Sequence, residues 1–155
     1  VVYGKRVGHF SAVELRGFLG NQKFLTSKKF TVVRNPYDRL ISAYNFAVQG
    51  GAVDGAVNNP TLYKGHAFRT FKSFVTEWLV HQDLPTVELI FRPQYLFVYD
   101  GENCLVDYVG KVEALHELEQ WLTQTMDKTI QIPHANKSKR SMSAEYLDQS
   151  TADLV

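Results

Sequence analysis

The chain of 155 residues is long enough to bury the core of one domain, and we expect residues 1–155 to form a single domain. Hydrophobic residues make up 45% of the sequence and aromatic residues 13%, a composition that excludes a disordered chain. The net charge of +1 excludes nucleic-acid binding through bulk charge, so any site for an anion must be local.

Cysteine content and hydropathy exclude some classes of protein. The single cysteine, Cys104, excludes an internal disulfide framework, and we expect it to be a small buried side chain. No apolar run reaches the roughly 18 residues that span a bilayer, and the first residues lack a signal-peptide pattern. We therefore expect no membrane contact by this segment. The abrupt start at Val1 and the helical pattern that runs to Val155 predict a piece of a longer protein.

The first predicted element is a helix over Ser11–Leu19. Ser11 and Glu14 match a capping box, and Gly20 stands where a helix commonly ends. His9 lies in the loop before this helix. Residues Lys23–Lys29 are predicted to form a polar connection to the next element.

A short buried strand is predicted over Phe30–Val33, where aromatic and β-branched side chains follow one another between polar neighbours. Asn35 suits a helix N-cap, and Pro36 suits the first helical position. The helix that follows has one apolar face, and Ser42 falls off that face. The apolar positions are Tyr37, Leu40, Ile41 and Tyr44.

Arg34 stands where this strand turns into the helix. Free backbone N–H groups, the positive end of the helix dipole and a guanidinium would meet there, and together they favour an anion. An ordinary strand–helix corner with Arg34 in a surface ion pair is the alternative that the residues leave open.

Two segments of different character follow the central helix. Gln49–His66 is rich in glycine and asparagine and predicts a long loop, either a binding loop or a tolerated surface insertion. Apolar residues at helical spacing predict an amphipathic helix over Thr70–His81, with its aromatic side chains in the core. These residues are Phe71, Phe74, Val75, Trp78 and Leu79.

Strands and helices alternate in the last third of the chain. Tyr95–Tyr99 and Leu105–Val109 are predicted strands around the turn signal Asp100-Gly101, paired as a hairpin or placed in parallel by another route. Apolar spacing from Leu115 to Leu122 predicts another helix. A basic loop over Pro133–Arg140 and short helices that start at Ser143 and Ser150 complete the chain. The order of elements indicates an α/β fold.

The residues around Arg34 carry a specific resemblance. Residues 33–44, VRNPYDRLISAY, closely resemble the 3′-phosphate-binding segment of the carbohydrate sulfotransferases, which use 3′-phosphoadenosine-5′-phosphosulfate (PAPS) as donor. In that family an arginine at the strand end and a serine eight residues later hold the 3′-phosphate of the donor. The resemblance therefore implies that Arg34 and Ser42 bind the donor.

Other phrases resemble the same family in the same order along the chain. They are Phe71–Val75, Arg92-Pro93-Gln94, Asp107–Glu113, Asn136-Lys137-Ser138 and Tyr146–Val155. The family fold implied is a P-loop-NTPase-like three-layer sandwich, with a central, mainly parallel sheet flanked by helices. The resemblance also implies that Asn136, Lys137, Ser138 and Lys139 belong to a loop over the donor nucleotide. A solvated basic turn is the alternative for these cations.

One part of the family pattern is missing from the sequence. The loop for the 5′-phosphosulfate lies upstream in the family, and Gly4–Gly8 has its composition but no Ser or Thr after the Lys. We expect a chain cut at both ends; a relative impaired in donor binding, a module that binds PAPS or its product without chemistry, is the alternative. A P-loop kinase is disfavoured because no G-x-x-x-x-G-K-[ST] is present.

Sulfuryl transfer needs positioning, charge stabilisation and a proton acceptor. The resemblance implies no metal, and the sequence has no cluster of ligand residues. Among five histidines, His9 is the predicted general base, because its place upstream of the phosphate motif is similar to that of the family's catalytic histidine. A surface histidine is the alternative. His66, His81, His116 and His134 are the others.

Partners and location follow from the resemblance as well. We expect a carbohydrate or other hydroxyl acceptor and no nucleic acid; Tyr63, Phe68 and Tyr95 could stack on a sugar or serve packing. The oligomeric state is unknown. Relatives occur as soluble bacterial enzymes and as lumenal domains of Golgi proteins; we expect the cytoplasmic bacterial type, with the Golgi lumen as the alternative if the segment belongs to a longer anchored chain.

We expect these 155 residues to transfer sulfuryl from PAPS poorly or not at all, because no stretch supplies the cation of the 5′-phosphosulfate loop. An assay with PAPS and a panel of carbohydrate acceptors measures this. Efficient turnover would contradict the expectation.

Overall fold

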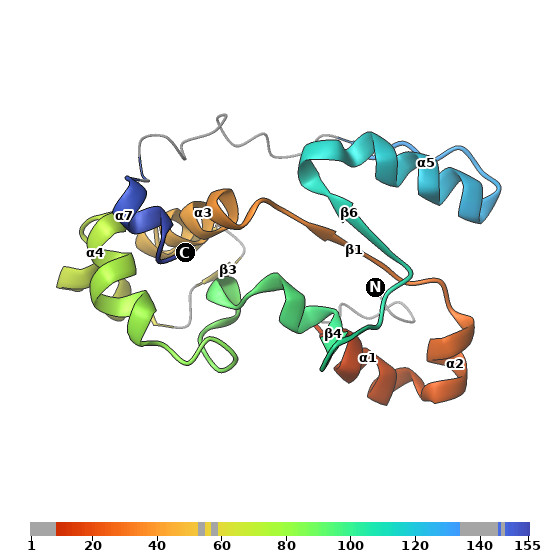
Figure 1. Cartoon of the computed structure of the whole chain (residues 1–155), viewed down its shortest axis with the longest axis horizontal. Coiled ribbons are helices and arrows are strands. Elements are labelled where there is room, and N and C mark those ends of the chain that lie inside the picture. Colours follow the sequence, from red (N-terminus) through yellow and green to blue (C-terminus); the bar gives the residue numbers. More distant parts are fainter. Residues whose placement is uncertain (1–8, 53–54, 57–58, 134–145, 147) are drawn as a thin grey trace. The chain divides into compact units, whose positions relative to one another are not determined.

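The computed structural model describes residues 9–52, 55–56, 59–133, 146 and 148–155. Contacts between residues divide the chain into two compact units (Figure 1). Unit 1 comprises the described residues up to Val33 and Pro93–Ile130, and unit 2 comprises those of Arg34–Arg92 and Gln131–Val155. The single domain expected from the sequence stays a prediction.

Unit 1 holds a parallel pair of strands, β1 (Phe30–Val33) and β6 (Tyr108–Lys111), with Phe30 opposite Tyr108. Lys29 and Asp107 fix this register. The Lys29 N–H donates to Asp107 Oδ2 at 2.7 Å, and the Asp107 N–H donates to the Lys29 carbonyl at 2.8 Å. The backbone N–H and the ammonium group of Lys29 hold the pKa of Asp107 below its ordinary value.

Helix α5 (Leu115–Met126) packs on β6 through a close approach at Gly110. A Cβ at Gly110 would lie 3.3 Å from the Cβ of Leu118, so a larger residue there would push the helix away. Leu118 is buried, and the ring of Trp121 stacks on Tyr108 with centroids 4.9 Å apart. The helix predicted from apolar spacing over these residues is confirmed.

The first helix, α1 (Ala12–Leu19), is confirmed with its capping box. The polar connection predicted over Lys23–Lys29 is wrong in part, because residues Asn21–Thr26 form helix α2. Gly20, with φ of 80°, ends α1 and starts α2. The buried side chain of Phe24 attaches α2 to the rest of the unit. The sequence analysis did not predict this helix, in which Phe24 is the buried residue.

Strand β1 is present as predicted but is less buried than expected. Phe30 is 47% exposed and Val32 is 39% exposed. The reason is that the sheet described here has only two strands, and β6 is the one strand beside β1 in the described part of the chain. A parallel sheet is usually covered on both faces, so this pair has apolar surface left over.

The hairpin around Asp100-Gly101 exists but is shorter than predicted. Strand β4 (Tyr99–Asp100) pairs antiparallel with β5 (Asn103–Cys104). The strand predicted over Tyr95–Tyr99 is wrong, because Gln94–Phe97 form a 3₁₀ turn, η6. Pro93 precedes this turn and cannot donate to a strand neighbour.

Two further sequence predictions are corrected in the same region. The strand expected over Leu105–Val109 is present but shifted to Tyr108–Lys111, since the Lys29–Asp107 hydrogen bonds set its start. It lies parallel to β1, and a parallel arrangement was one of the two that the sequence left open. Cys104 is exposed rather than buried, because it sits on the short, exposed strand β5.

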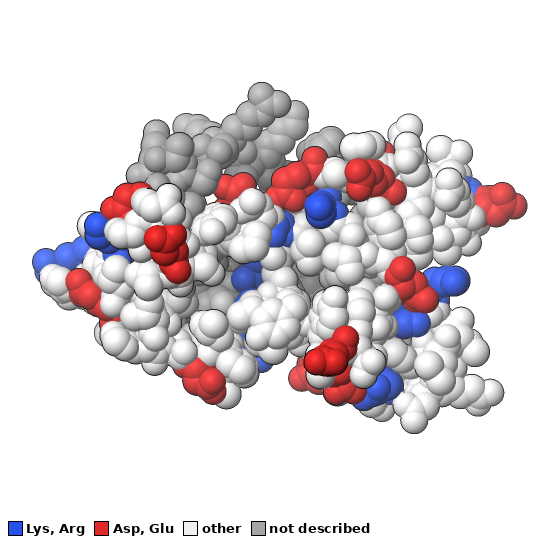
Figure 2. Space-filling view, in the orientation of Figure 1, with Lys and Arg blue, Asp and Glu red and all other residues white. Residues whose placement is uncertain are grey.

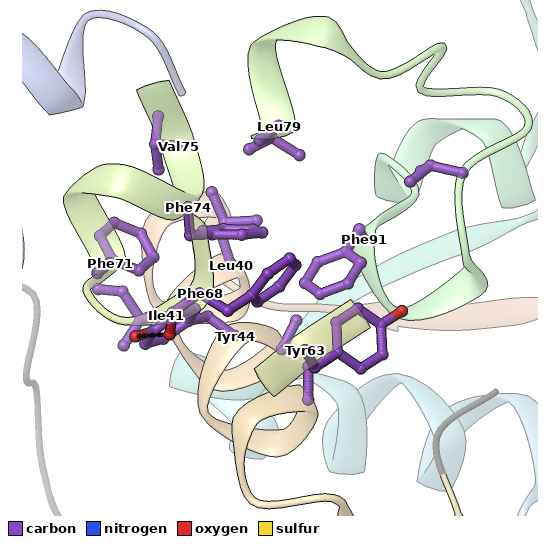
Figure 3. Packing of buried hydrophobic residues seen from close by; sticks show 13 residues of the cluster. Leu40, Ile41, Tyr44, Tyr63, Phe68, Phe71, Phe74, Val75, Leu79 and Phe91 are labelled. Atoms are coloured by element: carbon purple, nitrogen blue, oxygen red, sulfur yellow. Dashed lines mark hydrogen bonds between the residues drawn. The ribbon is translucent and has the colours of Figure 1, made fainter. Parts of the chain in front are cut away.

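Unit 2 is built on helix α3 (Pro36–Val48), whose apolar face lies against an aromatic cluster. Figure 3 shows this face packed against rings from three later segments. The Tyr44 hydroxyl donates to the carbonyl of Phe68 at 3.0 Å inside the cluster. Burial, with a smaller effect of Tyr146, raises the pKa of the Tyr44 phenol. The cluster comprises Leu40, Ile41, Ala43, Tyr44, Ala47, Tyr63, Phe68, Phe71, Phe74, Val75, Leu79, Val87 and Phe91.

The helix predicted over Thr70–His81 is present in three joined parts. Residue Thr70 caps α4 (Phe71–Ser73), a π-helical turn η3 (Phe74–Trp78) follows, and a 3₁₀ turn η4 (Leu79–His81) ends it. Phe74 and Val75 are fully buried, so the interpretation of these aromatic residues as core is confirmed.

The region predicted as a long loop, Gln49–His66, contains short ordered elements. They are the antiparallel pair β2 (Gly51–Ala52) and β3 (Gly55–Ala56), then the 3₁₀ turns η1 (Leu62–Lys64) and η2 (His66–Phe68). Tyr63 and Phe68 are buried in the core, which ties the end of this region to α3. Two more 3₁₀ turns are η5 (Leu89–Phe91) in unit 2 and η7 (Val112–Ala114) in unit 1.

The C-terminal segment is attached to α4 within unit 2. Helix α7 (Gln149–Ala152) has Asp148 as its N-cap, so it starts close to the predicted Ser150. The Lys72 ammonium forms an ion pair with Asp148, with 2.8 Å between Nζ and Oδ2. The ring of Tyr146 packs edge to face against the ring of Phe71, with centroids 5.6 Å apart. The predicted helix start at Ser143 lies outside the described residues.

These elements make a mixed α/β structure with a small parallel sheet and helices, as the sequence indicated. The parallel pair β1–β6 joins segments far apart in the chain, which requires a long crossover connection.

Phe74→Ala should lower the free energy of unfolding by about 3–5 kcal/mol, because the ring is fully buried and its loss leaves a cavity. Phe18→Ala is the matched control, because Phe18 is 57% exposed. Chemical denaturation of both variants measures the difference. Equal losses would show that the cluster in Figure 3 does not stabilise the protein.

Candidate functional site

The candidate site lies at the start of α3, entirely within unit 2. Asn35 is the N-cap as predicted, and its Oδ1 accepts from the N–H groups of Tyr37 at 3.0 Å and Asp38 at 3.4 Å. Pro36 has no N–H, and the Arg39 N–H donates to the Asn35 carbonyl at 2.9 Å. The backbone donors of the first turn are therefore already bonded, and the prediction of free N–H groups at this corner is wrong.

Charge at this corner comes from side chains. Arg34 precedes the helix and is half-buried, and the half-buried Asp38 lies in the first turn. Asp38 is favourable for the helix dipole but repels a second anion. Guanidinium and hydroxyl groups, rather than backbone N–H groups, are therefore the donors that this corner could offer to an anion.

Ser42 is exposed, as its position off the apolar face predicts. Its neighbours Ile41 and Ala43 are both buried, so Ser42 lies on the side of the helix away from the core. Arg34 and Ser42 thus belong to the same unit, at one helix, with a half-buried guanidinium and an accessible hydroxyl.

Arg39 is a residue of this helix that the sequence analysis did not single out. It is half-buried, and burial lowers the pKa of its guanidinium. Its side chain forms no hydrogen bond or ion pair with another residue in the described part of the chain. The signal in the sequence was an arginine three residues before Ser42, which places both on neighbouring positions of a helix.

The histidines are distributed over both units. His9 is exposed and lies in unit 1, two residues before the N-cap Ser11, so it is not part of the unit that holds Arg34 and Ser42. In unit 2, His66 Nδ1 lies 3.2 Å from Glu77 Oε2. His81 and His116 are exposed. The catalytic role of His9 stays a prediction.

The aromatic residues considered for sugar stacking differ in exposure. Tyr63 and Phe68 are buried, and the Tyr63 hydroxyl donates to Glu88, so both serve packing. Tyr95 is 58% exposed and remains accessible. The predicted nucleotide-loop residues Asn136, Lys137, Ser138 and Lys139, and His134 with them, lie outside the described residues.

Figure 2 shows acidic and basic side chains interspersed over the visible face, without an extended area of one sign. Among the described residues, no group of three or more His, Cys, Asp or Glu side chains is placed to hold a metal ion. No helix within the same residues is both long and apolar enough to cross a bilayer.

Comparison with protein families decides the relationship. A family model described as the sulfotransferase family, family 2, matches residues 6–153. The chain belongs to the sulfotransferase family. Comparison with curated proteins and with solved structures gave no significant match. The match covers nearly the whole chain and includes both Arg34 and Ser42, which supports sulfuryl transfer in general.

Asn35→Ala should lower the free energy of unfolding by about 1 kcal/mol, because two N–H groups of α3 lose their acceptor. Asn35→Asp keeps an acceptor oxygen and is the control. Thermal or chemical denaturation compares the two variants. If Asn35→Ala were as stable as Asn35→Asp, the cap would not hold this end of the sulfotransferase helix.

Proposed function

We propose that this chain is the core of a PAPS-dependent sulfotransferase that transfers a sulfuryl group to a hydroxyl of a carbohydrate acceptor. One observation carries the proposal: the half-buried Arg34 precedes α3, and the exposed Ser42 lies on its second turn, in a chain of the sulfotransferase family. A guanidinium supplies paired charge-assisted hydrogen bonds, and a hydroxyl adds one donor to the same phosphate.

The fold that we propose for the whole enzyme is a three-layer sandwich with a central, mainly parallel sheet. The pair β1–β6 supports it, since parallel strands occur almost only where helices cover both faces of a sheet. The exposed Phe30 and Val32 are the apolar side chains that such layers would cover. All 155 residues would then belong to one domain.

The reaction proposed is an in-line displacement at sulfur. The acceptor oxygen forms a bond to sulfur while the bond from sulfur to the 5′-phosphate oxygen breaks, and adenosine 3′,5′-bisphosphate leaves with the electron pair. The work of the protein is to position the two substrates and to balance the charge that develops on the leaving oxygen.

The proton of the acceptor hydroxyl must leave as the new bond forms. We propose His9 as its acceptor, because histidine is the most frequent general base in enzymes and His9 is exposed to solvent. The residues Asn136, Lys137, Ser138 and Lys139 are proposed donors to the nucleotide. No metal ion is proposed for this chemistry.

A second candidate function is a module that binds the nucleotide without chemistry. The lack of a recognisable 5′-phosphosulfate loop in the sequence favours it. Both functions need Arg34 and Ser42, so binding of the product nucleotide tests the shared site, and turnover by the full-length protein separates the two.

Arg34→Ala should weaken binding of adenosine 3′,5′-bisphosphate by about 1.5–3 kcal/mol, because a charge-assisted hydrogen bond is lost. Ser42→Ala should cost about 1 kcal/mol, as for a neutral donor. Isothermal titration calorimetry measures both. Arg69→Ala is the control, since Arg69 is an exposed arginine of the same unit.

Unchanged affinity in Arg34→Ala would mean that the corner serves only the structure of the protein. A circular dichroism spectrum of each variant accompanies the titration, so that a loss of binding is not confused with a loss of fold.

A further inference from the structure

Three observations place Arg39 beside the proposed phosphate site. Arg39 and Ser42 are three residues apart on α3, so their Cβ atoms are neighbours at about 5–6 Å. Side chains of a helix tilt toward its N-terminus, which directs Arg39 back toward the first turn. The opposite face of α3, with Leu40, Ile41 and Tyr44, is packed in the core of Figure 3.

The guanidinium of Arg39 forms no ion pair with any residue that the structure describes. Residues one turn away on the same helix are Asn35, Pro36, Ser42 and Ala43, none of which is acidic. Asp38 is its sequence neighbour, and adjacent residues of a helix do not face each other. In the described part of the chain the Arg39 side chain bonds no other residue. A half-buried cation without a partner costs free energy, and a bound anion would offset that cost.

The net charge at the start of α3 also favours a role for Arg39 in binding an anion. Asn35 occupies the first-turn N–H groups, so the backbone offers little to an anion. The charges of Arg34 and Asp38 cancel, whereas a phosphate monoester carries about −1.5 to −2 at neutral pH. Arg39 restores a net positive charge at this place.

We propose that Arg39 is a second guanidinium ligand for the 3′-phosphate of the nucleotide, acting together with Arg34 and Ser42. This inference rests on the proposed function, since it deepens the description of the same site. Three side chains from one short segment then surround one phosphate ester, two of them by charge and one by its hydroxyl.

The test compares two nucleotides that differ only in the 3′-phosphate. Isothermal titration calorimetry measures the affinity of adenosine 3′,5′-bisphosphate and of adenosine 5′-monophosphate for the wild type, Arg39→Gln, Arg39→Lys and the control Arg69→Ala. Arg39→Gln should bind the bisphosphate at least about tenfold more weakly, with little change for the monophosphate. Arg39→Lys keeps the charge but loses the fork, and should lie between. Arg69→Ala should match the wild type.

Melting temperature separates a ligand from a structural residue. Arg39→Gln should melt no lower than the wild type without nucleotide, because it removes an unpaired, half-buried cation. It should gain less stability than the wild type when the bisphosphate is added. A lower melting temperature without nucleotide would show a structural role and overturn the proposal.

Other outcomes would refute the role of Arg39 alone, or the proposed function with it. If Arg34→Ala loses the preference for the bisphosphate and Arg39→Gln retains it, the role of Arg39 is refuted while the proposed function stands. If both nucleotides weaken equally in Arg39→Gln, the residue does not read the 3′-phosphate. If the wild type itself shows no preference for the bisphosphate, the proposed function fails as well.

Discussion

The amide oxygen of Asn35 holds the start of α3, the helix on which the proposed phosphate site lies. By accepting from two N–H groups of α3, it stabilises the start of the helix and removes the backbone donors that an anion could use. The proposed recognition of a phosphate would then depend on side chains, which present charge at the end of flexible stems. A site of this kind is stable in the absence of ligand, because its backbone is satisfied before any nucleotide arrives.

The core of unit 2 keeps those side chains outside. Leu40, Ile41 and Tyr44 lie on the buried face of α3, and the Tyr44 hydroxyl bonds the Phe68 carbonyl within the aromatic cluster. A helix held on one face by large rings cannot rotate without opening the core. The exposure of Ser42 to solvent is therefore a consequence of packing on the far side of the same helix.

Helix caps, turns and apolar helix faces were predicted correctly, because they depend on residues close together in the sequence. The caps at Ser11 and Asn35, the turn at Gly101 and the helical face around Phe74 all appear where expected. Pairing between distant segments was harder to predict, since the start of β6 is set by hydrogen bonds between Lys29 and Asp107. The prediction of free N–H groups beside Arg34 was wrong because Asn35, the predicted cap, accepts from the N–H groups of Tyr37 and Asp38. Arg39 was missed because its burial, and the lack of a bonding partner for it among the residues that the structure describes, are properties of the folded protein.

The π-helical turn at Phe74–Trp78 has a consequence for how this helix can change in related sequences. A π turn holds one residue more than the α-helical turn that it replaces. Deletion of a single residue there would restore regular α-helix and leave Leu79 on about the same buried face, because the wide turn spends its extra residue without advancing the helix. If the same residues formed regular α-helix with no deletion, those after the turn would be rotated by about 100°, and Leu79 would leave the core.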